Sequence, residues 1–325
     1  MPQGRVSIGP AILARLRCPE CHAAIHSQNG TLECGAGHQL RYRDGYIDAS
    51  AAADDPLAAR TFASFGYEWN TFNQVVPEDE EFWREYFADV DLTELSGRVG
   101  LDAGCGKGRY TRFTARHLEA VVALDGSDAV VAAAQNLRDL PNVAVLKADL
   151  QRPPLAEHSF DFISCLGVLH HLGDPRGGFR ALTKLLAPGG LLVLYLYSRP
   201  ATRGLRAAAL AAATTMRRVT VRLPHRVLRP LSAGIATVLY GAVVWPGRAG
   251  AAGRVYVLQG LPLAAYRRRP LRALWLDTFD RLSAPAEARY LWEEVEGWYR
   301  EAGLDVEAVS EERGLTIIAR RPAKA

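Results

Sequence analysis

Acidic residues are missing from one long part of this 325-residue chain. Between Pro175 and Leu276 there is no Asp or Glu, while the same 102 residues carry 17 Lys or Arg. The rest of the chain holds all 35 acidic residues and only 22 of the 39 basic ones. A positive segment within an acidic remainder indicates a surface that meets an anionic partner, which could be a substrate, a membrane or a nucleic acid.

Cysteine is scarce, and its placement argues against a disulfide framework. Three of the five cysteines cluster near the N-terminus with a histidine, while Cys105 and Cys165 stand alone in apolar runs. This usage is typical of a metal site in a reducing compartment. The N-terminus also lacks the continuous apolar segment and cleavage site of a secretory signal. We therefore expect a cytoplasmic protein, with peripheral membrane contact left open.

Long hydrophobic runs are also few. The longest uncharged run, 230–247, has 18 residues, which barely reaches the length of a membrane span. It contains glycines and two prolines, and an arginine bounds it on each side. A buried helix or a membrane-surface helix therefore fits this run better than a span.

The composition, 49% hydrophobic and 23% charged, is that of a folded globular protein.

Strands and helices alternate from residue 97 onward. Amphipathic helices are expected between the strands at 109–119 and 128–140, and later at 285–303 before a strand pair that turns at Arg313–Gly314. Residues 61–87 are aromatic and partly helical, and 201–231 reads as one basic amphipathic helix. Five strands are expected, at 99–103, 120–125, 143–149, 160–165 and 189–197, which predicts a parallel sheet covered on both faces.

A glycine-rich turn follows the first of these strands. The segment "VGLDAGCGKGRYT" (99–111) places Gly104, Gly106 and Gly108 in a tight turn, where glycine lets the backbone approach a ligand closely. A second strand ends 21 residues after Gly104 at Asp125, and a carboxylate there can accept hydrogen bonds from two ribose hydroxyls. The pattern indicates a nucleotide-type cofactor, although turn glycines and capping aspartates of another nucleotide fold remain the alternative.

This stretch resembles the first motif of class I S-adenosylmethionine-dependent methyltransferases. Four further segments match that family in order and spacing: "VVALDGSD", "VLKADLQRPPLAEHSFDFISC", "LGVLHHLGDP" and "ALTKLLAPGGLLVLYLY". The resemblance covers residues 95–198 closely and 285–321 loosely. It implies an α/β fold with a Rossmann-like seven-stranded sheet and a helical insertion after the fifth strand. The cofactor-binding residues that it implies are Tyr67, Trp69, Asp102, Gly104, Gly106, Gly108, Asp125, Gly126, Asp149, Leu150 and Leu166.

The N-terminal cysteines have metal-ligand spacing. Cys18, Cys21, Cys34 and His38 read C-x2-C-x12-C-x3-H, which can surround Zn²⁺ with four protein ligands and predicts a closed, structural site. His22 and His26 are alternative ligands. The pattern resembles the zinc ribbon of ribosomal-RNA guanine-N1 methyltransferases and the Trm112-like ribbons of natural-product and envelope methyltransferases. The second group more often carries a fourth cysteine where this chain has His38.

The aromatic segment "SFGYEWNTF" (64–72) resembles the second group, in which it is expected to close over the cofactor. Phe65, Tyr67 and Trp69 could equally be helix-packing aromatics. The expected organisation is thus a zinc ribbon (1–50), an aromatic helical segment that closes over the cofactor (51–96), a cofactor-binding core (97–198), a basic helical lid (199–284), and a C-terminal helix with a strand pair (285–325).

Candidates for the chemistry lie after the fourth strand of the core. Methyl transfer needs mainly alignment and exclusion of water, and a general base is needed only for a weakly acidic hydroxyl. His170 and His171 are the candidate bases, although at least one is expected to pack structurally. Tyr195, Tyr197 and Asp174 are weaker candidates, and neither Cys105 nor Cys165 has a partner base in the sequence.

The expected function is methyl transfer from S-adenosylmethionine to a hydrophobic or anionic small molecule, such as a natural-product, lipid-linked or carrier-bound intermediate. A contact with an anionic membrane or an acidic carrier protein would suit the basic insertion. The first alternative is a zinc-ribbon RNA base methyltransferase, in which the same segment binds phosphates. The second is a protein that binds S-adenosylmethionine without transferring its methyl group.

Overall fold

The computed structural model describes residues 8–28, 30–50, 55–199, 205–252, 263, 266–311 and 314–323. The chain forms two compact units. Unit 1 comprises Met1–Arg199 and Ala286–Ala325, and unit 2 comprises Pro200–Pro285.

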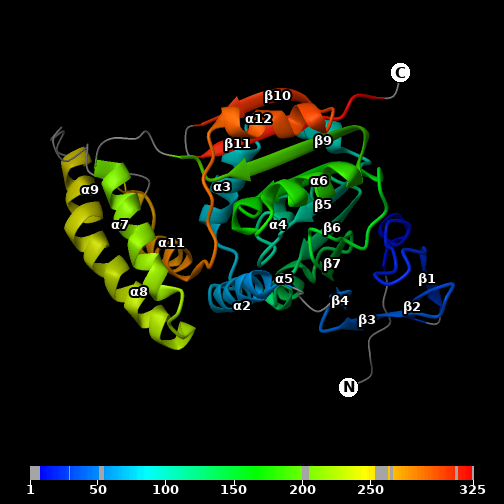
Figure 1. The fold of residues 1–325 in the computed structure, drawn as a ribbon, viewed down its shortest axis with the longest axis horizontal. Helices are drawn as coiled ribbons and strands as arrows, with labels where there is room; N and C mark the ends of the chain where they lie inside the picture. Colours follow the sequence, from blue (N-terminus) through cyan, green and yellow to red (C-terminus); the bar gives the residue numbers. More distant parts are fainter. Residues whose placement is uncertain are drawn as a thin grey trace. The chain divides into compact units, whose positions relative to one another are not determined.

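A sheet of mostly parallel strands forms the centre of unit 1 (Figure 1). Seven of its strands run in the order β7-β6-β5-β8-β9-β11-β10, with β11 antiparallel to both of its neighbours. This order confirms the Rossmann-like seven-stranded sheet predicted from the sequence. The strands are β5 (Val99–Ala103), β6 (Ala120–Asp125), β7 (Val143–Lys147), β8 (Phe160–Leu166), β9 (Leu186–Leu196), β10 (Asp305–Ser310) and β11 (Leu315–Arg320).

The inner strands are buried on both faces, as runs of apolar residues in a parallel sheet require. Every residue of β5 is buried, and so are all but the last residue of β6. The expected strand 143–149 ends at Lys147, so Asp149 lies in the turn that follows it. The parallel register brings the carboxyl ends of β5 and β6 to the same edge of the sheet, where Ala103 pairs with Leu124.

The N-terminal segment folds as short antiparallel strands, as expected for a ribbon. These are β1 (Ile25–Gln28), β2 (Thr31–Cys34), β3 (Gln39–Arg43) and β4 (Tyr46–Asp48). Strand β4 also pairs in parallel with β7, with Tyr46 opposite Val145 and Asp48 opposite Lys147. The ribbon therefore extends the core sheet to eleven strands.

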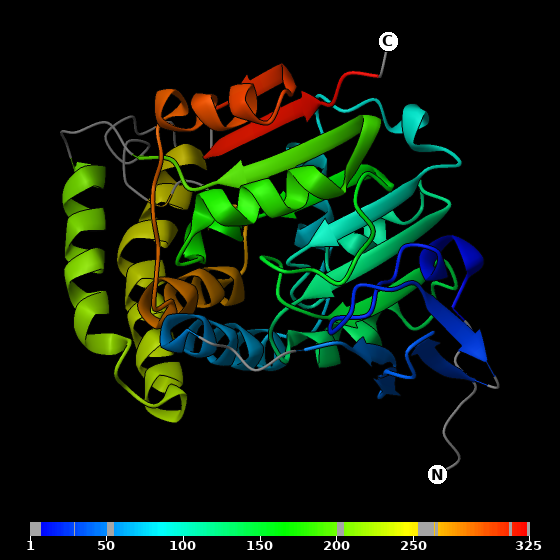
Figure 2. The same cartoon turned by 45° about the vertical axis from the view of Figure 1, so that its right-hand side comes forward.

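Helices of unit 1 lie against this sheet (Figure 2). Of the helix expected at 109–119, only the four residues of α4 are helical. The Thr114 hydroxyl donates to the Tyr110 carbonyl and accepts the Trp83 indole N–H. The bounds are α1 (Pro10–Leu13), α2 (Pro56–Thr71), α3 (Pro77–Tyr86), α4 (Thr111–Thr114), α5 (Ala129–Leu137), α6 (Pro175–Leu185) and α12 (Trp292–Glu301), with 3-10 turns η1 (Leu92–Leu95) and η2 (Leu169–His171).

The helix expected at 285–303 begins only at Trp292. Residues before it are extended, because their backbone bonds to the end of β9 and to the η2 turn. The Tyr290 N–H donates to the Tyr197 carbonyl at 2.9 Å, and the Ala288 N–H donates to the His170 carbonyl at 2.8 Å. This extended segment ties the C-terminal part of the chain to the histidine turn.

Unit 2 is helical, but the single helix expected at 201–231 is two helices. Residues 221–224 separate them, where Pro224 cannot continue the first helix. The unit contains α7 (Leu205–Thr220), α8 (His225–Leu239), the π-helical turn η3 (Tyr240–Val244), α9 (Trp245–Ala252) and α11 (Leu271–Ser283), and α11 packs against α8 and α7. Residues 200–204, 253–262 and 264–265 of the basic insertion, and Arg313 of the expected strand turn, lie outside the described residues.

One helix of the described chain, His225–Arg248, is long and apolar enough to cross a membrane, and 22% of its apolar window is buried. A single helix of this kind does not establish a span. The expectation of a fully buried helix does not fit this exposure, and the expectation of a membrane-surface helix stays a prediction.

Candidate functional site

The four predicted metal ligands lie together in the ribbon. The ligand atoms of Cys18, Cys21, Cys34 and His38 are all within 4.8 Å of one another. Cys18 Sγ is 3.4 Å from His38 Nδ1, and Cys21 Sγ is 3.6 Å from Cys34 Sγ. Since zinc–sulfur and zinc–nitrogen bonds are about 2.0–2.3 Å, such separations fit the edges of a tetrahedron around one ion. The cluster suggests a zinc site, and all four positions are filled by protein.

Local hydrogen bonds prepare one of these thiols for metal binding. Burial opposes ionisation of Cys18, but the backbone N–H groups of Cys21 and Glu20 lower the pKa of its thiol to about 7. A thiolate is the form of cysteine that binds a metal ion. The alternative ligands His22 and His26 are exposed and do not belong to the four-residue cluster.

The glycine turn after β5 is enclosed by side chains from two other segments. Gly104 and Gly106 have positive φ angles of 81° and 55°. A Cβ atom on Gly104 would lie 2.3 Å from Val168, and one on Gly106 would lie 3.0 Å from the Trp69 indole nitrogen. Because Val168 comes two residues before His170, the glycine turn and the histidine turn are in contact.

Asp102 is a buried carboxylate at the end of β5. It accepts hydrogen bonds from the Thr111 hydroxyl at 2.5 Å and the Ser164 hydroxyl at 3.3 Å. The pKa of Asp102 is raised to about 6, mainly by burial and to a smaller extent by the negative charge of Asp125, while the two hydrogen bonds lower it. A carboxylate held in this way would be stabilised by a cationic group.

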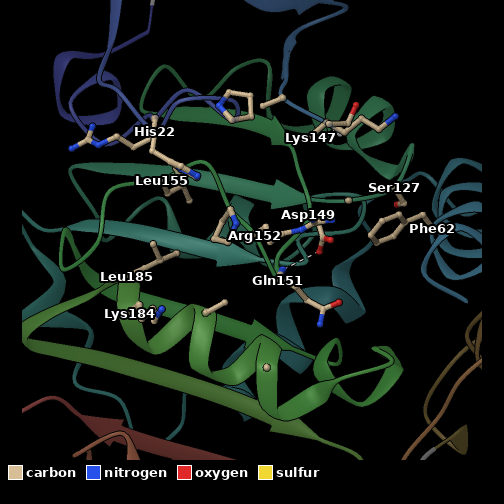
Figure 3. A pocket seen from close by; sticks show the side chains of 18 of the residues that line it. His22, Phe62, Ser127, Lys147, Asp149, Gln151, Arg152, Leu155, Lys184 and Leu185 are labelled. Atoms are coloured by element: carbon tan, nitrogen blue, oxygen red, sulfur yellow. Dashed lines mark hydrogen bonds between the residues drawn. The ribbon is translucent and has the colours of Figure 1, made fainter. Parts of the chain in front are cut away.

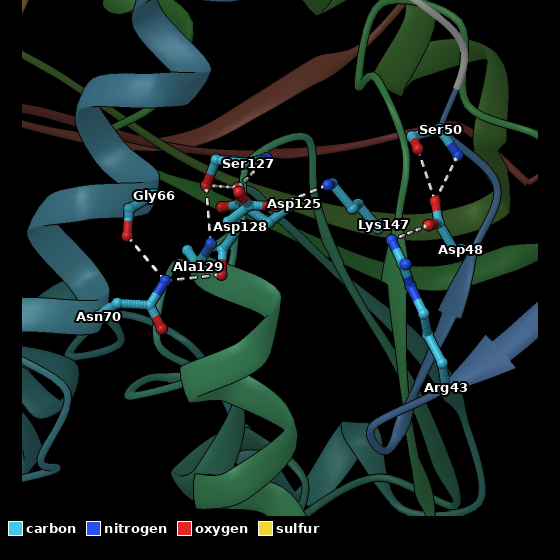
Figure 4. Close-up of polar contacts among 10 residues, drawn as sticks. All are labelled: Arg43, Asp48, Ser50, Gly66, Asn70, Asp125, Ser127, Asp128, Ala129 and Lys147. Atoms are coloured by element: carbon cyan, nitrogen blue, oxygen red, sulfur yellow. Dashed lines mark hydrogen bonds and ion pairs between the residues drawn. The ribbon is translucent and has the colours of Figure 1, made fainter. Parts of the chain in front are cut away.

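Asp125 ends β6 and is fixed by two turns, the glycine turn after β5 and the turn that follows β6. Figure 4 shows its contact with Ser127 in the second turn. Its carboxylate accepts the Gly106 N–H at 2.9 Å, and the Ser127 N–H and hydroxyl at 2.8 and 2.6 Å. Burial raises the pKa of Asp125 as well. A buried carboxylate and a half-buried one on neighbouring strands, beside a glycine turn, fit a cofactor that carries hydroxyl donors and a cationic group.

Helix α2 packs on this edge of the sheet through contacts that the sequence did not predict. The Asn70 side-chain amide bridges the carbonyls of Gly66 and Asp128 at 2.8 Å each, as Figure 4 shows. A Cβ atom on Gly126 would lie 2.6 Å from the Phe62 ring. Phe62 and Asn70 therefore belong to the site region, and the only signal for them in the sequence was the aromatic character of the segment.

Two basic residues of the glycine turn contact the segment before it. Lys107 Nζ lies 3.0 Å from an Asp79 carboxylate oxygen, and Arg109 lies 3.4 Å from the other. The Arg109 guanidinium also stacks over the Trp69 ring at 4.7 Å from its centroid. Helices α2 and α3 are thus both attached to the cofactor turn.

The other predicted cofactor residues occupy nearby turns. Asp149 accepts the Gln151 N–H at 2.9 Å in the turn after β7, and Leu150 is buried beside it. Leu166 ends β8, and Tyr67 is half-buried on α2. Gly108 has a φ of 77° and packs closely on Leu137 of α5, so its role is to let the turn approach that helix.

A cavity of about 1070 Å³ opens beside these turns (Figure 3). Gly126 and Asp149 line it, together with Phe62 from α2. Its far side is formed by His22 of the ribbon and by Lys184 and Leu185 at the end of α6. The cavity reaches from the expected adenosine end of the site to the N-terminal ribbon.

The two candidate bases have different environments. His171 Nδ1 lies 2.7 Å from the Ala286 carbonyl oxygen, and since a carbonyl can only accept, Nδ1 carries the proton. The neutral ring then keeps an unprotonated Nε2. His170 is fully buried, stacks on Tyr197 at 3.9 Å, and neither ring nitrogen has a hydrogen-bond partner among the described residues. Burial holds its pKa well below the usual value, so this ring is neutral.

The weaker catalytic candidates have structural surroundings. Asp174 accepts the Gly177 N–H at 2.8 Å and caps α6. Tyr195 packs between Tyr86 and Gly314, and Tyr197 stacks on His170. Burial raises the pKa of the Cys105 and Cys165 thiols, which keeps both of them protonated and weak as nucleophiles.

Comparisons with known proteins agree with this geometry. The methyltransferase-domain family matches residues 101–194, from β5 to β9. The tRNA U34 carboxymethyltransferase of Desulfotalea psychrophila is 27% identical over 180 residues, 53% of this chain and 53% of the relative. The ubiquinone biosynthesis O-methyltransferase of Pseudomonas paraeruginosa is 32% identical over 108 residues, 32% of this chain and 47% of the relative. The chain spans about half the length of these two curated relatives.

Among solved structures, the 1,6-didemethyltoxoflavin-N1-methyltransferase of Burkholderia thailandensis aligns with a TM-score of 0.49 at 15% identity, covering 92% of this chain and 99% of that one. The family match defines the class of the core: residues 101–194 form a class I S-adenosylmethionine-dependent methyltransferase domain, and the N-terminal ribbon carries a Cys3His cluster. The cofactor that this family implies is S-adenosylmethionine.

Proposed function

We propose that this chain transfers a methyl group from S-adenosylmethionine to a hydrophobic or anionic small molecule. One observation carries the proposal. Gly104 of the cofactor turn lies against Val168, so the turn that would hold the cofactor directly adjoins the turn of His170 and His171. Methyl transfer needs the acceptor and the sulfonium to be held in contact, and this junction brings the two sets of residues together.

When bound, S-adenosylmethionine supplies an electrophilic methyl group on a positively charged sulfur. The residues fit this cofactor, because the buried Asp102 and the half-buried Asp125 lie beside a glycine turn that only small residues can form. In the proposal Asp102 faces the methionine end, Asp125 accepts from the ribose hydroxyls, and the turn of Asp149 and Leu150 borders the adenine. Trp69 and Tyr67 on α2 cover the site and exclude water.

We assign the general base to His171 for acceptors that bear a hydroxyl. Its Nδ1–H is held by the Ala286 carbonyl, which fixes the ring and leaves Nε2 as the acceptor of a proton. His170 is the packing member of the pair, because its buried ring is stacked on Tyr197. An acceptor that is already anionic would need no base.

The nature of the acceptor follows from unit 2, which we propose to be the lid over the substrate. An acid-free, arginine-rich and largely apolar segment suits a natural-product, lipid-linked or carrier-bound intermediate. The relative from Pseudomonas is named as an O-methyltransferase of ubiquinone biosynthesis, which is consistent with a hydrophobic hydroxyl-bearing acceptor. A contact with an acidic carrier protein stays a prediction.

In the same proposal residues 1–50 are a structural zinc ribbon, 51–96 the aromatic segment that closes the site, and 97–198 with 285–325 the cofactor-binding core. The lid comprises 199–284. Residues 51–54, at the start of the aromatic segment, lie outside the described residues.

The test is transfer of a labelled methyl group from S-adenosylmethionine into an organic extract of cells, with total RNA from the same cells in a parallel reaction. We expect label in the organic fraction, and loss of that label with the Asp125→Asn variant. Label found only in RNA would establish the RNA methyltransferase alternative. Cofactor binding without label in any fraction would establish a binding protein that does not transfer the methyl group.

A further inference from the structure

Exposed apolar side chains concentrate in unit 2. Eleven large hydrophobic residues are exposed in the described chain, and seven of them belong to this unit: Met216, Val219, Val227, Leu231, Val238, Trp245 and Leu271. The unit comprises residues 200–285, about a quarter of the sequence. Single exposed apolar residues are ordinary, but a concentration of this kind marks an interaction surface.

Three of these side chains form a stripe along α8. Val227, Leu231 and Val238 are 47%, 42% and 67% exposed, and they are four and seven residues apart, which places them on one face of a helix. Gly234 and Gly241 are exposed between and after them. The π-helical turn η3 follows, and Trp245, 66% exposed, adds an indole ring at the start of α9.

The other face of the same helix is packed within unit 2. Leu228, Ser232 and Ala236 are fully buried, and the Trp275 indole N–H of α11 donates to the Ser232 hydroxyl at 3.1 Å. The helix is therefore anchored to its own unit on one side. The exposed stripe is a second, separate apolar face of a folded element.

The charged residues of unit 2 are nearly all positive. Residues 200–285 contain fourteen arginines, no lysine and two aspartates, Asp277 and Asp280. The Asp277 carboxylate accepts the Tyr266 hydroxyl. Exposed arginines lie at and before the start of the stripe, at Arg218, Arg222 and Arg226. An apolar face flanked by arginines is the pattern of helices that lie in the interface of an anionic membrane.

We propose that the stripe of Val227, Leu231 and Val238, with Trp245, docks unit 2 on the surface of an anionic lipid bilayer. The apolar side chains enter the headgroup boundary, and the neighbouring arginines contact lipid phosphates. A second copy of the chain is a poorer occupant, since its own residues 200–285, with fourteen arginines against two aspartates, would bring the same positive charge to the contact. RNA is also a poorer occupant. Aliphatic side chains do not bind phosphates, and Trp245 is, among the described residues, the one exposed aromatic ring beside the stripe on which a base could stack.

A membrane span is also disfavoured by this packing, because the Ser232 face is held by α11 and would have to leave it to meet lipid. The proposed docking surface does not depend on methyl transfer. It would hold equally for a chain of this fold that binds the cofactor without using it.

The experiment is flotation of the full chain with vesicles of phosphatidylcholine, with and without phosphatidylglycerol. We expect binding to the anionic vesicles, weak binding to the neutral ones, and release at about 0.5 M salt, where screening shortens the range of charges to a few ångströms. The Val238→Glu variant should reduce binding to anionic vesicles by about tenfold or more. Val238 is 67% exposed, so the fold should tolerate the exchange, which circular dichroism and the thermal midpoint will check.

The matched control is Val309→Glu, the same exchange at an exposed valine of β10 in unit 1. This variant should bind as the unchanged chain does. Failure of the unchanged chain to bind anionic vesicles, or an equal loss with both variants, would overturn the proposal. A stripe variant that alters only the oligomeric state would also overturn it and would identify a second copy as the occupant. Binding that resists both salt and alkaline extraction would overturn it as well and would indicate a membrane span.

Discussion

The Lys107 ammonium and the Asp79 carboxylate form an ion pair, 3.0 Å apart, in which the two side chains are only 3% and 4% exposed. Lys107 stands within the glycine turn, and Asp79 stands in the first turn of α3. The Lys107 ammonium also donates to the Gln74 carbonyl at 2.6 Å. A buried charge thus joins the cofactor turn to the aromatic segment before it.

Breaking this pair should destabilise the protein strongly. In an Asp79→Asn variant the Lys107 charge stays buried, while residue 79 no longer carries the opposite charge. Removing one partner of a buried ion pair typically costs about 3–5 kcal/mol of stability. We expect a loss of this size in the free energy of unfolding, measured by urea titration. The variant should also bind S-adenosylmethionine more weakly, because α3 would no longer hold the glycine turn.

The control for that prediction is Asp139→Asn, which removes an ion pair with Arg112 at 2.8 Å on the surface. Water and salt screen a pair of this kind, so its loss should leave the urea midpoint nearly unchanged. Equal effects of the two substitutions would mean that the Lys107–Asp79 pair does not hold the segment.

Zinc should be present at one ion per chain and should stabilise the ribbon. We expect His38→Ala to lose the metal, because three remaining ligands bind it less tightly than four. The same variant should lower the thermal midpoint, because metal binding contributes to folding in small ribbons. Elemental analysis of the purified protein measures the stoichiometry. His26→Ala, at an exposed histidine outside the cluster, should keep its zinc, and zinc-free protein with an intact ribbon would refute the assignment.

Asp102 should cost stability at neutral pH in the absence of cofactor. Its pKa is about 6 in the folded protein and about 3.9 in an unfolded chain, so the folded state gains stability as pH falls from about 6 toward 4. Asp102→Asn should therefore raise the free energy of unfolding by about 1–3 kcal/mol at pH 7, and the gain should shrink toward pH 4. Urea titrations at several pH values measure this. A gain that does not depend on pH would contradict the burial argument.

His171 should matter for reaction with hydroxyl acceptors and His170 should not. His171→Asn can keep a donor for the Ala286 carbonyl while removing Nε2, and loss of a general base typically lowers kcat by about 10²–10⁴. His170→Phe keeps a ring to stack on Tyr197 and should retain most activity. Steady-state rates with one hydroxyl acceptor compare the two variants. The reverse order of effects would move the assignment to His170.

The order of the core elements could be predicted from the sequence because each one carries a local pattern. Apolar runs of strand length gave the positions of β5 to β9, and the C-x2-C-x12-C-x3-H spacing identified the four ligands that the structure brings together. These signals arise within a few residues of one another. They do not depend on which distant segment a strand or a thiol finally meets.

Pairings between distant segments were not predictable in the same way. The parallel pairing of β4 with β7 adds the ribbon to the core sheet, although nothing in residues 46–48 distinguishes them from a strand of an independent ribbon. The attachment of Asp79 to Lys107 and of Asn70 to Asp128 likewise depends on tertiary contacts. The segment before α12 is extended where the local pattern predicts a helix, because its hydrogen bonds go to Tyr197 and His170, which lie far away in the chain.

The most direct test of the methyltransferase assignment is a calorimetric titration of the full chain with S-adenosylmethionine, beside the Asp125→Asn variant. This exchange keeps one oxygen, which can accept from either Gly106 or Ser127, and removes the charge offered to the ribose. We expect one cofactor molecule per chain, with affinity reduced about 10- to 100-fold in the variant, the usual effect of losing charge-assisted hydrogen bonds. Absence of binding to the unchanged chain, or equal affinity in the two proteins, would contradict the assignment.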